Sequence, residues 1–123
     1  MIEEYKVNGM AIGQTYIIPN IDKTEERVLN YFEVEQRTPK KVITPILKNL
    51  SQTITIIKHI EIYPKFRKKG YGGKLLKEII NKSSGDVVLI AEQALDFLTD
   101  WYISNGFEIV GYSHNLPILV LKK

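Results

Sequence analysis

An α+β fold, in which helices pack on one mixed β-sheet, is what this sequence predicts. The first half of the chain consists mainly of extended segments, whereas the second half alternates strand patterns with apolar residues at helical spacing. A strand, a helix and a second strand in succession form a right-handed crossover, so those two strands should run parallel. The other strands then extend the same sheet in antiparallel fashion, which makes the sheet mixed.

The chain of 123 residues has the size of one domain. Because no linker, internal repeat or low-complexity tract divides it, we expect residues 1–123 to form a single domain. The sequence contains no cysteine and only two histidines. Disulfides, thiolate metal sites and cysteine nucleophiles are therefore excluded, and we expect no metal site.

Net charge and hydropathy point to neither a nucleic acid nor a membrane as the partner. The 17 Lys and Arg residues and the 14 Asp and Glu residues give a net charge of +3, which is too small to indicate either. No apolar run has the length of a membrane span, and Met1–Tyr5 lacks the basic and apolar regions of a signal peptide. We therefore expect a cytoplasmic protein.

The N-terminal half is expected to be mainly extended. Residues 5–18 form a long extended stretch that Pro19-Asn20 should end, and residues 21–30 form a polar connection with room for a helical turn. Residues 31–35 alternate apolar and charged side chains, as a half-buried strand does. Over residues 38–49 a proline at position 45 would break a helix, so extended structure is favoured. No clear pair of amphipathic helices is expected here.

A central strand is predicted over Thr53–Tyr63 and should stop at the following proline. Period-2 alternation places four isoleucines on one side of this strand, namely Ile54, Ile56, Ile60 and Ile62. His59 and Glu61 share the other side. Lys58 interrupts the apolar row directly after Ile57, so a β-bulge that shifts the register is expected there. For the Lys58 side chain, a position at the surface is favoured over contact with phosphates.

The rest of the chain follows a helix–strand–helix–strand order. Apolar residues at helical spacing, from Leu75 to Ile80, predict a helix that ends at residues 83–85. The continuous apolar run after it predicts a strand buried on both faces, and Asn105-Gly106 should cap a second helix. In chain order, this strand, the second helix and the last two strands are expected over residues 87–91, 95–104, 107–112 and 117–121.

A basic, glycine-rich turn between the central strand and the first of these helices is the most informative segment. Three glycines stand where the helix begins, and six Lys and Arg residues lie between Lys65 and Lys77. The first N–H groups of a helix have no partner within it, the helix dipole adds to their attraction for anions, and glycine lets a phosphate approach the backbone. Neither the Walker nor the Rossmann pattern is present, which excludes nucleoside triphosphates and dinucleotides. A solvated basic turn and a nucleic-acid patch remain as alternatives.

Two motifs resemble those of the GNAT superfamily of N-acyltransferases. Arg67-x-x-Gly70-x-Gly72, three residues after a proline that ends a strand, is similar to the acyl-CoA signature of that family. Residues 101–108, in which Tyr102 stands four residues before Gly-Phe, resemble the end of a helix near the family's C-terminus. Together the motifs cover residues 54–121.

The resemblance implies a GNAT-like fold with splayed parallel central strands, between which acetyl-CoA binds as the acyl donor without a metal. The residues expected to bind acetyl-CoA are Ile60, Ile62, Arg67, Lys68, Lys69, Gly70, Tyr71, Gly72 and Gly73. Tyr102 is implied as the general acid that protonates the departing thiolate, although an aromatic residue at helical spacing is also typical of a core. His59 and Glu61 are the candidate general bases, because they share one face of the central strand. His114, in the last turn, is expected to be exposed.

The implied function is an acyl-CoA-dependent N-acetyltransferase that transfers acetyl from acetyl-CoA to a primary amine by direct attack. A protein lysine or N-terminus is slightly preferred over a small amine as the acceptor. The alternative is a non-catalytic acyl-CoA-binding or nucleic-acid-binding module on the same fold. Leu95, which stands where many family members have an asparagine, and the missing helical pair favour this alternative. A homodimer is a further option, formed through the final strand or the N-terminal edge.

Overall fold

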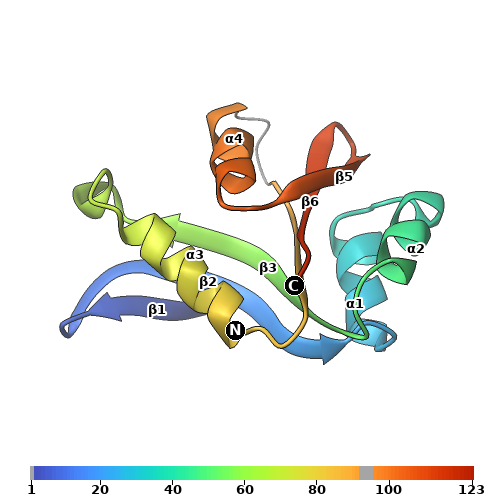
Figure 1. Ribbon diagram of the computed structural model, residues 1–123, viewed down its shortest axis with the longest axis horizontal. Helices are drawn as coiled ribbons and strands as arrows, with labels where there is room; N and C mark the ends of the chain where they lie inside the picture. Colours follow the sequence, from blue (N-terminus) through green and yellow to red (C-terminus); the bar gives the residue numbers. More distant parts are fainter. Residues whose placement is uncertain (1, 92–95) are drawn as a thin grey trace.

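The computed structural model describes residues 2–91 and 96–123 and contains a six-stranded sheet in the order β1-β2-β3-β4-β6-β5 (Figure 1). Its strands are β1 (Ile2–Val7), β2 (Met10–Asp22), β3 (Thr53–Ile62), β4 (Asp86–Ile90), β5 (Glu108–Ser113) and β6 (Leu116–Leu121). The helical elements are α1 (Glu26–Leu29), the π-helical η1 (Asn30–Glu35), α2 (Lys40–Lys48), the 3-10 turn η2 (Pro64–Phe66), α3 (Tyr71–Lys82) and α4 (Asp96–Ser104). The predicted α+β fold with a mixed sheet is confirmed.

β3 and β4 pair parallel, and the other neighbouring strands of the described sheet pair antiparallel. α3 makes the crossover between β3 and β4, as the strand–helix–strand pattern predicted. The residues of α3 that recur at helical spacing, Leu75, Leu76 and Ile79, are buried against the sheet. One amphipathic helix therefore both connects the two central strands and covers them.

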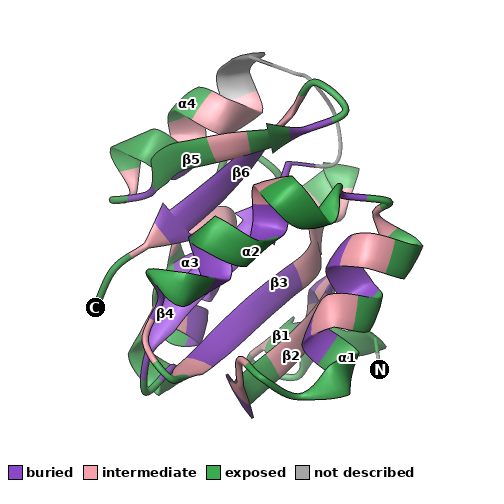
Figure 2. Cartoon of the chain, turned by 90° about the vertical axis from the view of Figure 1, so that its right-hand side faces the viewer, coloured by how far each residue is buried: buried purple, intermediate pink, exposed green. Residues whose placement is uncertain are grey.

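Helices cover both faces of the sheet, and each face has its own apolar core. α1, η1 and α2 contribute to the core that contains Ile54 and Ile56 of β3. α3 and α4 contribute to the core on the other face, which contains Ile57. Figure 2 shows buried residues along β3 and β4 between the helical layers. Because these strands are covered on both sides, their sequence is almost continuously apolar where they pair.

The expectation of a strand over residues 31–35 is wrong, because these residues form η1. Tyr31 and Phe32 are adjacent in sequence and both buried in the same core, whereas Val34 is 65% exposed. A strand would send the two adjacent aromatic residues to opposite faces of the sheet. The N–H of Gln36 bonds to the carbonyl of Tyr31, five residues earlier, which is the wide turn of a π-helix.

α2 overturns the expectation of extended structure over residues 38–49. The helix buries three residues at helical spacing, namely Ile43, Ile46 and Leu47. Pro45 lies inside the helix at an exposed position. The hydrogen bond that it cannot make would go to the carbonyl of Lys41, an exposed residue, so water can replace it. The first 50 residues therefore do contain a pair of helical segments on one face of the sheet.

β2 is longer than expected, because Pro19-Asn20 does not end it. The register between β2 and β3 shifts between Ile18 and Ile21, and Asn20 has a positive φ of 47° at this irregularity. The N–H of Asn20 donates to Oγ1 of Thr55 at 3.1 Å. The strand absorbs the extra residue and continues to Asp22.

The elements predicted from the central strand onward are confirmed, with one correction that concerns the edges of the sheet. β6 lies between β4 and β5, so the outer strands are β1 and β5, and the final strand is not an edge. Gly106, which has a φ of 98°, follows α4 as the predicted cap. Leu95 lies outside the described residues.

Candidate active site

A groove opens where the two parallel strands separate. β3 and β4 pair only over Ile54–Ile57 and Asp86–Leu89. Beyond Ile57, β3 stays with β2, whereas β4 pairs with β6 up to Ile90. The groove has a volume of about 840 Å³ and is lined by the second half of β3, the glycine-rich turn, the end of β4 and α4. The splayed parallel strands implied by the resemblance are present.

The predicted β-bulge lies at Lys58. In the pairing of β2 with β3, Tyr16 faces His59 and Ile17 faces Ile57, which leaves Lys58 as the extra residue on β3. The bulge changes which side chains share a face. Ile60 and Ile62 pack with Ile57 on the α3 and α4 side, not with Ile54 and Ile56 as expected. His59 and Glu61 therefore lie on the face that α1, η1 and α2 cover.

Lys58 is not at the surface, in contrast to the expectation from sequence. Its side chain is only 13% exposed, and its Nζ lies 2.9 Å from the carboxylate of Glu35. The same Nζ lies 4.4 Å from the ring centre of Tyr16 and 5.2 Å from that of Tyr31, which are cation–π distances. The bulge residue therefore connects β3 to β2 and η1 at the point where the central strands separate.

The glycine-rich turn presents backbone N–H groups to the groove. Gly70 stands at the N-cap of α3 with a φ of 81°, a conformation that glycine adopts without strain, and no side chain caps the helix. Tyr71, Gly72 and Gly73, whose N–H groups have no partner within the helix, all line the groove. Nε of Arg67 donates to the carbonyl of Ile62 at 2.8 Å, which braces the turn against the end of β3.

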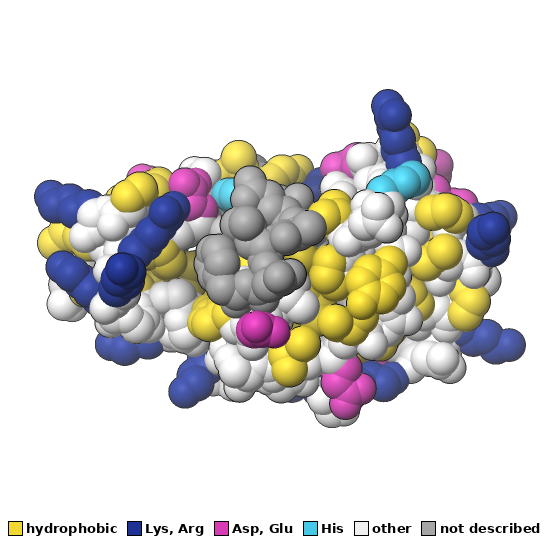
Figure 3. Space-filling model, turned by 90° about the horizontal axis from the view of Figure 1, so that it is seen from above, with side chains coloured by type: hydrophobic (Ala, Val, Ile, Leu, Met, Phe, Trp, Pro, Cys, Tyr) yellow, Lys and Arg dark blue, Asp and Glu magenta, His cyan; other side chains and the backbone are white. Residues whose placement is uncertain are grey.

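Positive charge surrounds this turn. Lys65, Lys68 and Lys69 are exposed, and Lys68 also lines the groove. Figure 3 shows several Lys and Arg side chains at the end of the molecule that carries η2 and the start of α3. Uncapped helix N–H groups and nearby ammonium groups both favour anions such as phosphates.

Tyr102 belongs both to the core and to the groove. It is 6% exposed and packs against Trp101 and Phe107, with ring centres 5.0 and 5.5 Å away. It also lines the groove together with Trp101 and Leu98. Gly72 faces Trp101, since a Cβ on this glycine would lie 3.5 Å from the indole ring. The two motifs noted in the sequence therefore meet across the groove.

His59 and Glu61 lie side by side. Nε2 of His59 is 3.6 Å from Oε1 of Glu61, and the two side chains are 33% and 34% exposed. Gln14 of β2 donates to the same carboxylate oxygen at 2.9 Å, a contact that the sequence analysis missed. Both candidate bases line the groove, whereas His114 does not. His114 is exposed, as expected, and its Nε2 lies 2.7 Å from the carbonyl oxygen of Arg37.

The described part of the chain contains neither a cluster of metal ligands nor a membrane-spanning helix. Residues 2–91 and 96–123 contain no group of three or more His, Asp or Glu side chains arranged to hold a metal ion. None of the helices in this part of the chain is long and apolar enough to cross a membrane.

The architecture is that of the GNAT N-acetyltransferases, which confirms the resemblance at the level of the fold. Neither a protein-family model nor a curated protein sequence matches the chain. Among solved structures, PaiA N-acetyltransferase from Thermoplasma acidophilum in complex with coenzyme A has a TM-score of 0.60 and 14% identity, with 100% of this chain and 60% of that chain covered.

Two further structures are similar over almost the whole chain. A GNAT family acetyltransferase from Elizabethkingia anophelis with acetyl-CoA bound has a TM-score of 0.62 and 19% identity, covering 99% of this chain and 75% of that one. Arabidopsis thaliana Naa50 in complex with the bisubstrate analogue CoA-Ac-MVNAL has a TM-score of 0.61 and 12% identity, with 99% and 72% covered. The chain therefore spans less than two thirds of the length of PaiA and about three quarters of the other two.

Proposed function

We propose that this protein is an acyl-CoA-dependent N-acetyltransferase that transfers acetyl from acetyl-CoA to a primary amine. The observation that carries the proposal is the uncapped, glycine-rich start of α3, which opens onto a groove between separated parallel strands. Two solved structures of the same fold hold coenzyme A or acetyl-CoA. We also propose that residues 1–123 act as one domain, and a cytoplasmic location stays a prediction.

The pyrophosphate of acetyl-CoA would bind at the turn, and the pantetheine arm along β3. The residues proposed for this binding remain Ile60, Ile62, Arg67, Lys68, Lys69, Gly70, Tyr71, Gly72 and Gly73. All of these except Lys69 line the groove. Because β3 has no β4 partner beyond Ile57, the backbone N–H and C=O groups on that side are available to the amide groups of the arm.

The proposed transfer is a direct attack of the amine on the thioester. The amine nitrogen forms a bond to the acetyl carbon, the carbon–sulfur bond breaks, and CoA leaves as a thiolate that takes up a proton. Tyr102, at the α4 side of the groove, is the proposed donor of that proton. A backbone N–H freed by the bulge would stabilise the oxyanion that forms during the attack.

The amine must lose its own proton before or during the attack. An amine of ordinary pKa near 10.4 is almost wholly protonated at pH 7, and deprotonating it costs about 4 to 5 kcal/mol unless a base assists. His59 and Glu61 are proposed for this role, directly or through a water molecule. A neutral imidazole nitrogen can accept a proton, and Nε2 of His59 lies 3.6 Å from the Glu61 carboxylate, which can take part in the same step.

A protein or peptide amine is the acceptor that we propose. The first 50 residues were expected to lack a helical pair, but α1, η1 and α2 cover this face of the sheet, so an open acceptor side does not support the choice. Support comes instead from the Naa50 structure, whose bisubstrate analogue CoA-Ac-MVNAL joins CoA to a peptide. The acidic Glu61 and Glu35 on this side are compatible with a cationic acceptor.

Thiol release from acetyl-CoA in the presence of amines tests the proposal. We expect release with lysine-bearing or N-terminal peptides that exceeds release with polyamines or with no amine. CoA binding without thiol release would favour the non-catalytic module. Steeply salt-dependent binding to DNA or RNA, without CoA binding, would favour the nucleic-acid alternative.

Variants of the turn test the cofactor site separately. Gly72→Val adds an isopropyl group next to Trp101 and the groove, and we expect CoA affinity to fall by about tenfold or more in a folded protein. Lys68→Ala, next to the groove, should weaken CoA binding more than Lys77→Ala, whose exposed side chain does not line the groove. Equal CoA affinity by calorimetry in all three variants would contradict the assignment.

A further inference from the structure

Gln14 of β2 contacts one of the two proposed bases, although Gln14 itself does not line the groove. Its Nε2 donates to Oε1 of Glu61 at 2.9 Å, and Nε2 of His59 lies 3.6 Å from the same oxygen. Both contacts therefore involve Oε1. Because the two oxygens of a carboxylate share one carbon and one plane, a contact that holds Oε1 also sets the direction of Oε2.

The contact between Gln14 and Glu61 depends on the strand register beside the bulge. In the pairing of β2 with β3, Gln14 faces Glu61 and Tyr16 faces His59, and the register shifts directly after these pairs, between Tyr16 and Ile17. Side chains directly opposite each other on antiparallel strands have Cβ atoms about 4.5 to 5.5 Å apart, which lets an amide reach a carboxylate. An interior strand pair, and not a loop, therefore places the amide of Gln14.

Gln14 also faces a second carboxylate, that of Glu4 on β1. The Glu4 side chain is 56% exposed and lies 3.9 Å from Nζ of Lys6, whereas the Glu61 side chain is 34% exposed. Of its two acidic neighbours, Gln14 thus donates to the one that is more buried. A hydrogen bond is electrostatically stronger where less water surrounds it, so this contact can orient the Glu61 carboxylate.

We propose that Gln14 is a positioning residue for the acetyl transfer, because it keeps Oε2 of Glu61 directed at the acceptor amine. The inference rests on the proposed function. The amine gives a proton to Oε2, the electron pair on nitrogen forms the bond to the acetyl carbon, and Glu61 becomes a neutral acid that later returns the proton to water. The terminal torsion of a glutamate has broad preferences, so a carboxylate without the Gln14 contact can turn away from the amine.

A purely structural role for Gln14 predicts a different outcome. A hydrogen bond between half-buried groups contributes modestly to stability, because water can replace a lost partner. An error in the orientation of a base lowers the rate of the chemical step much more. Loss of the Gln14 amide should therefore lower kcat and leave the fold, CoA binding and acceptor binding nearly unchanged.

Gln14→Met tests the inference, because methionine has a similar length and no N–H donor. We expect kcat to fall by about tenfold, with KM for a lysine-bearing peptide and CoA affinity within about twofold of wild type. Gln52→Met is the matched control. Gln52 also donates to a carboxylate, that of Asp22, at 2.9 and 3.0 Å, but it does not line the groove, so kcat should stay at the wild-type value. Circular dichroism should show the same fold in both variants.

A double variant shows whether Gln14 acts through Glu61. In Glu61→Ala, which removes the carboxylate, adding Gln14→Met should change the residual kcat by less than about twofold, because the group that Gln14 directs is already gone. A tenfold loss in both backgrounds would overturn the inference, and so would wild-type kcat in Gln14→Met alone. A wild type that releases no thiol with any amine would overturn the proposed function, and the positioning role with it.

The contact itself can be tested without activity. In a nitrogen–proton NMR spectrum, the side-chain amide signals of Gln14 should shift in Glu61→Ala and stay unchanged in Glu108→Ala, which removes an exposed carboxylate outside the groove. Gln14 signals that do not respond to the loss of Glu61 would overturn the inference and leave the proposed function intact.

Discussion

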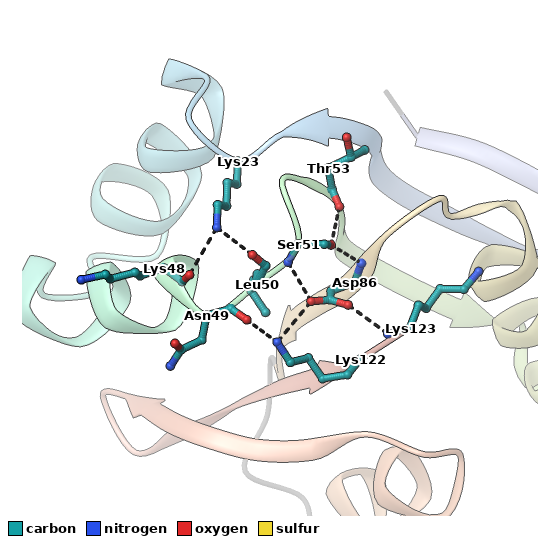
Figure 4. Close-up of polar contacts among 9 residues, drawn as sticks. All are labelled: Lys23, Lys48, Asn49, Leu50, Ser51, Thr53, Asp86, Lys122 and Lys123. Atoms are coloured by element: carbon teal, nitrogen blue, oxygen red, sulfur yellow. Dashed lines mark hydrogen bonds and ion pairs between the residues drawn. The ribbon is translucent and has the colours of Figure 1, made fainter.

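The two ends of the β3–β4 pair differ in whether the backbone polar groups near them have hydrogen-bond partners. At the end where the strands are paired, a network of hydrogen bonds surrounds Asp86 (Figure 4). Its carboxylate accepts from the N–H of Ser51 and from the N–H of Lys123, each at 2.9 Å. Ser51 accepts from the N–H of Asp86 at 2.8 Å and donates to the carbonyl of Thr53 at 2.7 Å. Nζ of Lys122 lies 3.4 Å from the same carboxylate.

At the other end, the same two strands separate and leave the N-terminal N–H groups of α3 without a side-chain cap. The same strand pair therefore contributes stability where its polar groups are hydrogen-bonded, and offers a candidate ligand site where they are not. Substitutions at the paired end should therefore cost stability, and substitutions at the open end should cost activity or binding in a folded protein.

The largest expected effect is at the open end, on Tyr102. Tyr102→Phe removes one hydroxyl and keeps the ring that packs on Trp101 and Phe107. If the phenol protonates the thiolate, kcat should fall by about 10² to 10⁴ while the free energy of unfolding changes by less than about 1 kcal/mol. Tyr112→Phe, at an exposed phenol on β5, is the control. A stability loss with unchanged kcat would instead assign Tyr102 to the core alone.

The paired end should respond in the opposite sense. Asp86 is 4% exposed, and Asp86→Ala leaves the N–H groups of Ser51 and Lys123 without their acceptor. We expect a loss of about 2 to 4 kcal/mol in the free energy of unfolding, measured with urea. CoA affinity of the remaining folded protein should stay unchanged. Asp100→Ala, on the exposed side of α4, should change stability by less than about 0.5 kcal/mol.

Acid should weaken the paired end through Asp86. Burial raises the pKa of the Asp86 carboxyl, but hydrogen bonds from Lys123 and Ser51, with Lys122 nearby, outweigh it and hold this pKa below its ordinary value. The ionised carboxylate therefore stabilises the fold at every pH above about 3.9, and this contribution is lost as the pH falls through the lower folded-state pKa. In thermal unfolding, the gap between wild type and Asp86→Asn should stay constant above about pH 5 and shrink below about pH 4. If the difference in stability between wild type and Asp86→Asn already shrinks near neutral pH, the pH dependence belongs to another group.

The open end was more predictable from sequence than the helices of the first half. The turn is local: a proline that ends a strand, then glycines at the start of an amphipathic helix, and all of these lie within a dozen or so residues. The bulge at Lys58 was visible as a lysine that interrupts an apolar row. Two helical segments were missed because Pro45 was taken as a breaker and because the alternation after residue 30 imitated a strand.

Contacts between distant segments could not be predicted. Gln14 reaches Glu61 only because β2 and β3 pair in one particular register, across 47 residues of sequence. The face on which Ile60 lies depends on whether the bulge adds its residue before or after that position, and the sequence alone does not specify this. Lys58 likewise meets Glu35 through a π-helical turn that no sequence pattern indicated.

The smallest expected effect is at Lys58. Its side chain lies at the bulge, directly after the part of β3 that pairs with β4. Lys58→Met keeps the stem against Tyr16 and Tyr31 but removes the charge that pairs with Glu35. The two cation–π contacts and the partly exposed ion pair are worth about 1 kcal/mol each, so stability should fall by no more than about 3 kcal/mol.

If Lys58 fixes the bulge, and with it the positions of His59 and Glu61, kcat should fall by about tenfold while CoA affinity stays the same. Lys58→Arg keeps a cation at the rings and should recover most of kcat. Glu35→Gln should have a smaller effect, because Glu35 is 42% exposed and the ring contacts of Lys58 survive its loss. Wild-type kcat in Lys58→Met would mean that strand pairing alone sets the bulge, and that the contrast between the two ends of β3 does not depend on this side chain.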